Sequence, residues 1–306
     1  MDSYLNIKKI ALIGFGEVGQ IFAQGLLPFV DQVKVWDVKF SGVDLVLEEQ
    51  EKIKNFKLYA SNTLANACSG ADLIISAVTA SNTLQVAQAI SLCVEPGCYF
   101  LDLNSASPST KQAASTLIND QGGIYVEAGV MTSVPPYGIA VPILLGGSRA
   151  HTLAEVLLSW GMDVRVVSED VGRASAIKMC RSVMIKGLEA LVIESYVTAR
   201  HYGVEDFMIP TLQETFPGID WEKQGSYFFS RVVQHGKRRA EEMREAAVTV
   251  KDAGFTPSMS SATADKHDWI AKKAREGIFK DLTKLSSWQS YADCLLDMND
   301  NYLYKK

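Results

Sequence analysis

Three glycines near the start of the chain have the types and spacing of a phosphate-binding turn. An apolar run ends in Gly14-Phe15-Gly16-Glu17-Val18-Gly19. In such a turn the first glycine allows a sharp bend, the second lets backbone approach a pyrophosphate, and the third lets the next helix pack closely on the sheet. The free N–H groups at that helix N-terminus then face the phosphates. We therefore predict that residues 14–19 bind a dinucleotide.

An acidic residue follows where the ribose of the dinucleotide is expected. Asp37 closes the next apolar run, and its carboxylate would accept hydrogen bonds from the adenosine ribose hydroxyls. A carboxylate there repels a 2′-phosphate, which favours NAD over NADP, although Lys39 could reach such a phosphate. Strand, glycines, helix, strand and acid occur in order, which a chance glycine cluster would not provide. Val78 and Thr79, at the end of the run 72–78, which is predicted to be a fully buried strand, are predicted to line the same cradle.

A single lysine is the sharpest candidate for proton transfer. Lys178 stands at the start of a long helical pattern and is flanked by Ala, Ile, Met and Cys. Apolar surroundings disfavour the ammonium form, and a neutral lysine amine can act as a general base. Alternatively, the lysine stem lies along a helix surface with its charge in water. The residues alone leave both interpretations open.

Polar residues follow three of the predicted strands. In an open α/β sheet the ligand crevice lies beyond the carboxyl ends of the strands. The polar exits are residues 79–82, 102–108 and 128–138. Ordinary loops also contain Ser, Thr, Asn and Gly, but these exits share one predicted edge, which favours a binding site there.

Composition excludes several classes of protein. The chain has 306 residues, 47% of them apolar, and a net charge of −5, with no basic stripe for nucleic acid. It shows neither a signal-peptide pattern nor an apolar stretch of the ~20 residues that a membrane span needs, so we predict a cytoplasmic protein. Five cysteines lack CxxC spacing and four histidines are dispersed, so we predict no metal.

Apolar runs alternate with helical patterns through the first half of the chain and predict a doubly wound, mostly parallel α/β sheet. The later part, from 170 on, is predicted to be all-helical, giving a dinucleotide-binding domain at 1–169 and a helical domain at 170–306. The predicted strands are 33–37, 57–60, 72–78, 98–102, 124–128, 141–145 and 164–167, after a first strand ending before Gly14. The predicted helices after the sheet are 171–202, 207–215, 221–253, 258–277 and 288–301, with breaks at Pro210, Pro217-Gly218, 254–257 and Gly277.

The long helix at about 171–202 is predicted to connect the two domains. Its apolar spacing predicts a buried face made of Ile177, Cys180, Met184, Leu188, Leu191 and Ser195. An extended apolar face favours a homodimer, although the same face could be buried within one subunit.

Taken together, the glycine turn, the stretch 102–108, the turn 130–133 and the stretch 172–178 resemble the β-hydroxyacid dehydrogenase family. This family includes 3-hydroxyisobutyrate and 6-phosphogluconate dehydrogenases, and the resemblance spans residues 8 to about 200. It implies that Lys178 is the acid/base on the substrate hydroxyl. It also implies that residues after two strands hold the substrate carboxylate, here Asn104, Ser105, Thr132 and Ser133.

The chain departs from the family at two points. Ser182 stands where the family usually has Asn, four residues after the lysine, and Met131-Thr132-Ser133 replaces a Ser-Gly-Gly turn. Substrate geometry is therefore expected to differ, with Ser182 assisting by hydrogen bonding. The second half resembles a branch with a helical C-terminal domain of formerly unknown function, one member type of which acts on the branched sugar acid apionate.

A charged stripe in the second half is a weaker candidate. His235, Arg238 or Arg239, and Glu242 share one helical face. An arginine fork such as that of Arg239 could grip a carboxylate or phosphate of the substrate together with His235. A solvated or dimer-contact salt-bridge face would give the same pattern.

The resulting prediction is an NAD-dependent dehydrogenase that oxidises a secondary alcohol of a small 3-hydroxy acid or sugar acid. The sequence does not show whether decarboxylation or isomerisation follows. One alternative is an imine reductase on the same scaffold, which a protonated lysine beside an iminium cation disfavours. Another is a nucleotide-sensing module without turnover, which would tolerate loss of Lys178.

Overall fold

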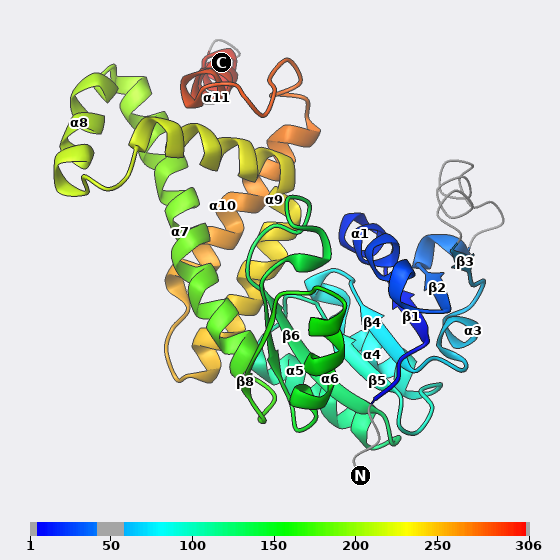
Figure 1. The fold of residues 1–306 in the computed structure, drawn as a ribbon. Helices are drawn as coiled ribbons and strands as arrows, with labels where there is room; N and C mark the ends of the chain where they lie inside the picture. Colours follow the sequence, from blue (N-terminus) through cyan, green and yellow to red (C-terminus); the bar gives the residue numbers. More distant parts are fainter. Residues whose placement is uncertain (1–4, 42–57, 304–306) are drawn as a thin grey trace. The chain divides into compact units, whose positions relative to one another are not determined.

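The computed structural model describes residues 5–41 and 58–303, which form two compact units that divide between Met179 and Cys180 and are called unit 1 and unit 2. Unit 1 is built on one twisted sheet in the order β3-β2-β1-β4-β5-β6-β7-β8 (Figure 1). All neighbouring strands pair in parallel except β6 and β7, which are antiparallel. The strands are β1 (Lys9–Ile13), β2 (Gln32–Trp36), β3 (Tyr59–Ala60), β4 (Leu73–Ser76), β5 (Tyr99–Asp102), β6 (Ile124–Val130), β7 (Ile143–Gly146) and β8 (Val164–Ser168). The predicted doubly wound sheet is confirmed; Lys57, in the predicted strand 57–60, lies outside the described residues.

Apolar side chains alternate between the two faces of the sheet, and each face is covered by helices. Leu12 and Val33 point to one face, where they meet Phe22 and Leu157 of the covering helices. The helices on this face are α1 (Glu17–Leu26) and α6 (Ala150–Ser159). On the other face lie α3 (Leu64–Cys68), α4 (Thr83–Ser91) and α5 (Pro108–Asn119). Because both faces are covered, the polar groups that remain accessible gather at the strand ends.

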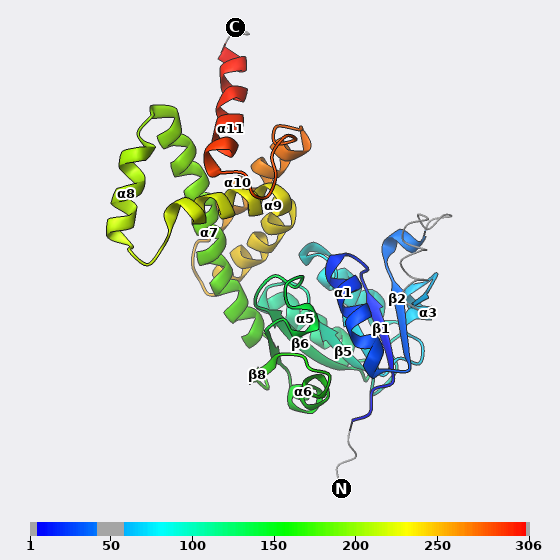
Figure 2. The same ribbon diagram turned by 45° about the horizontal axis from the view of Figure 1, so that its top comes forward.

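Unit 2 is helical, as predicted (Figure 2). Its core is aromatic, with Tyr196 packed edge-on against Trp288 at 4.9 Å and Phe229 stacked on Tyr291 at 6.0 Å between ring centroids. Gly236 lets two helices approach, since a Cβ there would lie 2.7 Å from the His267 carbonyl oxygen. The helices are α8 (Glu205–Thr215), α9 (Trp221–Asp252), α10 (Ser258–Arg275) and α11 (Trp288–Leu303), preceded by α7 (Arg173–Tyr202), which begins in unit 1.

The predicted buried face of α7 is wrong. Ile177, Met184 and Leu191 are 43%, 65% and 53% exposed. The side chains that α7 buries instead include Lys186 and Glu189, because both find charged partners on α9. The buried side of α7 also carries Val192, Ile193 and Tyr196, which belong to the core of unit 2.

The predicted helix break at Pro210 is also wrong. Pro210 lies inside α8, which runs without interruption from Glu205 to Thr215. A proline in a helix removes one backbone hydrogen bond. Here the neighbouring Ile209 is 7% exposed and belongs to the core of unit 2, so packing holds the helix together through the proline.

Candidate functional site

The glycine turn between β1 and α1 has the close approaches that its sequence predicts. Gly14 has a φ of +95°, and a Cβ there would lie 2.5 Å from the Ala77 carbonyl oxygen of the neighbouring strand exit. At Gly19 a Cβ would lie 1.9 Å from the Gly14 carbonyl oxygen. A side chain at either position would therefore push α1 off the turn.

Gly16 differs from the other two glycines because it faces open space. Nothing lies within 4 Å of the position its Cβ would take, and it precedes the first residue of α1 without a side-chain cap. Glu17 is exposed and Val18 is half-buried beside it. A bare helix N-terminus with room in front of it suits a pyrophosphate, so these residues fit a dinucleotide.

Asp37 is held against the glycine turn. Its Oδ2 accepts a hydrogen bond of 2.7 Å from the Phe15 backbone N–H, and its Oδ1 accepts one of 3.1 Å from the Lys39 N–H. The Phe15 ring is buried and packs edge-on against Phe40, with ring centroids 5.9 Å apart. The predicted ribose-binding carboxylate is therefore fixed beside the predicted phosphate-binding turn.

The exit of β4 is tied to the exit of β5 by Asn104. The Asn104 Oδ1 accepts a hydrogen bond of 2.7 Å from the Val78 N–H, and its Nδ2 donates one of 2.9 Å to the Ser76 hydroxyl. The residue is 3% exposed. Thr79, next to Val78, is exposed and accepts a hydrogen bond of 2.9 Å from Asn82. Asn104 thus positions the strand ends around the glycine turn.

Lys178 and Ser105 meet although they are far apart in sequence. The Lys178 Nζ donates a hydrogen bond of 2.5 Å to the Ser105 Oγ, and Lys178 is half-buried. Both residues belong to unit 1, since the first turns of α7 stay with the sheet. The amine is directed at the polar exit of β5, which is the place that the sequence predicts for the substrate.

A buried network anchors the loop that carries Ser105. Asp102 accepts a hydrogen bond of 2.6 Å from the Tyr125 hydroxyl and pairs with the Lys111 Nζ at 2.9 Å, and both charged side chains are 1% exposed. The Asp102 Oδ1 also accepts the Asn104 N–H at 2.9 Å. Burial and the adjacent Asp102 carboxylate raise the pKa of Tyr125 well above its usual range. These contacts fix the backbone just before Ser105.

Thr132 and Ser133 lie directly beyond β6. Thr132 is exposed and Ser133 is half-buried. Because β5 and β6 are parallel neighbours, these residues lie at the same edge of the sheet as Ser105.

Ser182, His235 and Arg239 belong to unit 2, where each has its own surroundings. The Ser182 hydroxyl accepts a hydrogen bond of 3.1 Å from Lys186, and the Arg239 guanidinium makes a two-point pair with the buried Glu189. Burial and the nearby arginines, Arg231 first, lower the pKa of His235 to about 4. The structure therefore gives Arg239 a structural partner within the helical unit.

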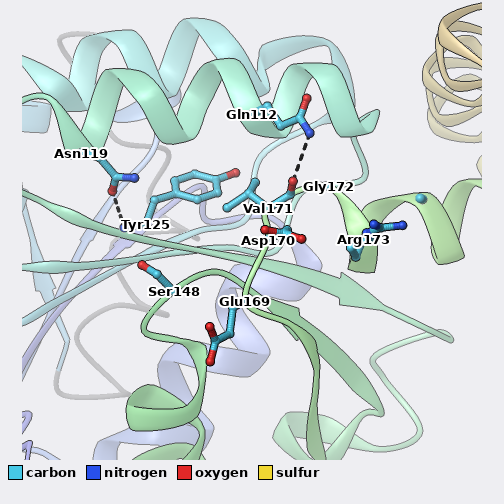
Figure 3. A pocket seen from close by; sticks show the side chains of 10 residues that line it. Gln112, Asn119, Tyr125, Ser148, Glu169, Asp170, Val171, Gly172 and Arg173 are labelled. Carbon is cyan, nitrogen blue, oxygen red and sulfur yellow. Dashed lines mark hydrogen bonds between the residues drawn. The ribbon is translucent and has the colours of Figure 1, made fainter.

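A cavity of about 670 Å³ lies elsewhere in unit 1 (Figure 3). It is lined by Gln112 of α5, Tyr125 of β6 and the segment 169–173 between β8 and α7, where Gln112 donates to the Val171 carbonyl oxygen. None of its lining residues belongs to the glycine turn or to the Lys178–Ser105 pair. The candidate site therefore consists of the glycine turn 14–19 and the Lys178–Ser105 pair, and it does not include this cavity.

The sequence analysis names Asp102 within a polar exit but misses two other buried charges that support the site, Glu127 and Lys111. Charged residues are almost never fully buried unless paired, so Glu127 inside the apolar run 124–128 is a signal that could have found it. Lys111 stands in a polar helical stretch and gives no such signal.

The described ranges, 5–41 and 58–303, contain neither a metal-binding cluster of side chains nor a membrane-spanning helix. No three His, Cys, Asp or Glu side chains there are grouped so that they could hold a metal ion. No helix in those ranges is both long and apolar enough to cross a membrane.

The sheet, the glycine turn and the fixed acid define a dinucleotide-binding α/β protein with a helical second unit. Residues 9–172 match the model of the NAD binding domain of 6-phosphogluconate dehydrogenase, and the chain belongs to this family. Residues 199–270 match a domain of unknown function, DUF1932. The predicted family, its branch and a nicotinamide dinucleotide as cofactor are thereby confirmed.

Several relatives lack an assigned activity. The chain is 35% identical to a conserved hypothetical protein from Sinorhizobium meliloti 1021, covering 94% of this chain and 96% of that one with a TM-score of 0.73. It is 29% identical to an uncharacterized protein of Methanothermus fervidus, covering 83% of this chain and 96% of the relative. It is also 29% identical to a conserved protein of unknown function described as similar to 3-hydroxyacid dehydrogenases (TM-score 0.66, covering 88% and 98%).

Two enzymes share the fold at lower identity. Mycobacterium tuberculosis 3-hydroxyisobutyrate dehydrogenase is 16% identical with a TM-score of 0.68, covering 87% of this chain and 94% of that one. A Streptomyces aurantiacus imine reductase is 19% identical with a TM-score of 0.51, covering 94% and 99%. At these identities the likeness concerns the fold.

Proposed function

We propose that the protein is an NAD-dependent dehydrogenase that oxidises a secondary alcohol of a small 3-hydroxy acid or sugar acid. The observation that carries the proposal is the 2.5 Å hydrogen bond between the Lys178 amine and the Ser105 hydroxyl at the carboxyl edge of a dinucleotide-binding sheet. Family membership supports an oxidoreductase, and the lysine supplies the proton transfer that alcohol oxidation needs.

Lys178 accepts the proton of the substrate hydroxyl in its neutral form. Bound NAD would supply the hydride acceptor. Ser105 orients the amine and, with Thr132 and Ser133, offers hydroxyls to the substrate carboxylate. Asn104 positions the two strand exits through its contacts to Val78 and Ser76. If the product is a β-keto acid, the protonated Lys178 can return its proton to the enolate formed on decarboxylation or rearrangement.

Asp37 supports a preference for NAD over NADP. Its carboxylate is held beside the turn by the Phe15 N–H. A second negative group at that place, such as a 2′-phosphate, would be repelled. The positive charge of the neighbouring Lys39 would attract a 2′-phosphate, which weakens the preference for NAD.

Ser182, His235 and Arg239 remain proposals for substrate binding. Arg239 is paired with Glu189, so a substrate anion would have to compete with a buried carboxylate for it. A homodimer is also proposed, because Met184 and Leu191 of α7 expose apolar surface. Light scattering of the purified protein would test the dimer.

Imine reduction is the second candidate function, and the shared fold of the imine reductase favours it. The Lys178–Ser105 pair disfavours it, since a protonated lysine is unfavourable beside an iminium cation. A nucleotide-sensing module without turnover is the third candidate. Such a module would keep the turn 14–19 but would not need the pair.

The test is a screen for NADH formation with NAD or NADP over 3-hydroxy acids and aldonic acids, including apionate. A parallel screen follows NADH or NADPH consumption with cyclic imines. Oxidation of at least one hydroxy acid supports the proposal. Turnover of imines alone, or tight NADH binding with no turnover of either class, contradicts it in favour of the second or third candidate.

A further inference from the structure

One buried carboxylate of β6 holds the beginning of the helix that carries Lys178. The Glu127 side chain is fully buried, and four donors from the start of α7 point at it. Its Oε1 accepts the Gly172 and Ala174 N–H groups at 2.7 and 2.9 Å. Its Oε2 accepts the Ser175 hydroxyl at 2.7 Å and the Ser175 N–H at 3.3 Å.

The three backbone N–H donors are among the groups that a helix leaves without partners in its own first turn. A carboxylate satisfies several of them at once, and its negative charge interacts favourably with the helix dipole. Burial strengthens both effects, because no water competes for the same N–H groups. Glu127 therefore fixes the first turn of α7 in position and in rotation about its axis. Lys178 lies one turn after Ala174.

Two glycines make room for this contact. At Gly146 of β7 a Cβ would lie 2.6 Å from the Glu127 Oε1. At Gly129 of β6 a Cβ would lie 3.1 Å from the Ala174 carbonyl oxygen and 3.7 Å from the Lys178 Cβ. The absence of side chains at Gly146 of β7 and Gly129 of β6 thus leaves room for Glu127 and for the start of α7 with Lys178.

The partner of Lys178 is held in a similar way from the neighbouring strand. Asp102 of β5 is the register partner of Glu127, and it anchors the backbone that leads to Ser105. Two adjacent buried carboxylates therefore position the two halves of the pair, one through a loop and one through a helix. Lys111 compensates the charge of Asp102, and the start of α7 compensates that of Glu127.

We propose that Glu127 is a positioning residue for Lys178, acting through the first turn of α7. The proposal rests on the proposed function in so far as Lys178 is the acid/base of the reaction. The structural part of the proposal does not depend on that function. It states that without the Glu127 carboxylate the Lys178 amine no longer forms its hydrogen bond with Ser105.

The experiment compares the full-length parent with Glu127→Gln, which keeps the shape but turns an amide donor towards helix N–H groups. The matched control is Asp72→Asn. Asp72 also accepts two backbone N–H groups, those of Lys8 and Lys9 at 2.8 Å, but at the opposite end of the sheet. Two readouts are taken: kcat, KM and NADH affinity on the acid found in the screen, and the acylation rate of Lys178 by an amine-reactive ester.

Acylation is followed by peptide mass spectrometry, with the exposed Lys251 as internal reference. We expect Glu127→Gln to lower kcat about 10- to 100-fold, the range that a misplacement of about 1 Å produces. The NADH affinity should stay within about twofold, because the glycine turn does not depend on α7. Lys178 should be acylated at least about twofold faster once it is released from Ser105, the factor that corresponds to losing a hydrogen bond worth about 0.5 kcal/mol or more. Asp72→Asn should match the parent in every readout.

Equal kcat and equal Lys178 acylation in a folded Glu127→Gln variant would overturn the proposal. So would an equal effect of Asp72→Asn, because the loss would then not be specific to α7. If Glu127→Gln does not fold, Ser175→Ala takes its place, since it removes the 2.7 Å hydrogen bond from the Ser175 hydroxyl to the Glu127 Oε2 and leaves the three backbone contacts. A smaller change in the same direction supports the proposal, and no change in either readout overturns it. If the parent oxidises no acid, the proposed function fails, and the acylation rate alone decides on Glu127.

Discussion

Two glycines of the cofactor turn should fail in different ways when a methyl group is added. Gly16 faces open space and Gly19 faces backbone, so Gly16→Ala tests cofactor binding alone, whereas Gly19→Ala tests binding and packing together. A charge-assisted hydrogen bond is worth about 1.5–3 kcal/mol, so losing one phosphate contact should weaken NADH binding about 10- to 100-fold. Gly16→Ala should lower the free energy of unfolding by no more than ~1 kcal/mol, the cost of alanine at a helix N-cap.

At Gly19 the new Cβ must move from 1.9 Å to at least 3.0 Å from the Gly14 carbonyl oxygen, so α1 must shift by about 1 Å. Overpacking of this kind costs about 1–3 kcal/mol, and the free energy of unfolding should fall by that amount. NADH affinity should fall as well, because the proposed phosphate-binding N–H groups lie at the start of α1.

Affinity is measured by NADH fluorescence titration and stability by urea unfolding. Gly25→Ala is the control: it lies in the same helix, and its Cβ would meet the Ile139 side chain at 2.4 Å, away from the turn. It should lose stability and keep its NADH affinity. If Gly16→Ala binds NADH as tightly as the parent, the assignment of residues 14–19 to the pyrophosphate is wrong.

Three further predictions concern other charged groups. Asp37→Ser should raise the affinity for NADPH relative to that for NADH, measured by the same fluorescence titration. An unchanged ratio of the two affinities would mean that Asp37 does not contact the adenosine ribose. Lys111→Met leaves Asp102 buried without its ion-pair partner, so the free energy of unfolding in urea should fall by about 3–5 kcal/mol; a loss below ~1 kcal/mol would contradict this account. Burial, and then Arg239, lower the pKa of His267 to about 3 in the folded protein. In the unfolded chain His267 has its ordinary pKa of ~6.5 and therefore binds a proton more readily. The free energy of unfolding should therefore fall as the pH falls below ~6.5. Between pH 6 and 4 the parent should therefore lose up to ~1.4 kcal/mol more per pH unit than His267→Gln in urea unfolding, and parallel profiles would show that His267 does not titrate in this way.

Much of unit 1 could be predicted because its signals are local. The glycine turn, Asp37 and the alternating runs each depend on neighbours within a few residues, and the predicted strands and exits match the structure. Lys178 was singled out from its apolar neighbours, but its contact with Ser105 crosses the fold and could only be inferred from a family resemblance.

The wrong buried face of α7 and the overlooked Glu127 both involve contacts between residues that are far apart in the sequence. Met184 and Leu191 belong to the predicted buried face of α7, but both are exposed. Periodicity does not show that Lys186 and Glu189 have ion-pair partners on α9 and can therefore be buried. Glu127 was overlooked because its value depends on the start of α7, which lies far along the chain. Long-range charge pairs thus allow Lys186 and Glu189 to be buried on α7, and long-range hydrogen bonds to Glu127 hold the start of that helix.

The central claim is that Lys178 transfers the proton during alcohol oxidation, and Lys178→Met tests it most directly. Methionine keeps an unbranched side chain that is shorter by one heavy atom, and it lacks the amine. On the acid identified by the screen, kcat should fall about 100- to 10,000-fold, the usual contribution of general acid–base catalysis, while NADH affinity stays unchanged. A variant that turns over as fast as the parent would contradict the mechanism and leave a dinucleotide-binding fold without an assigned base.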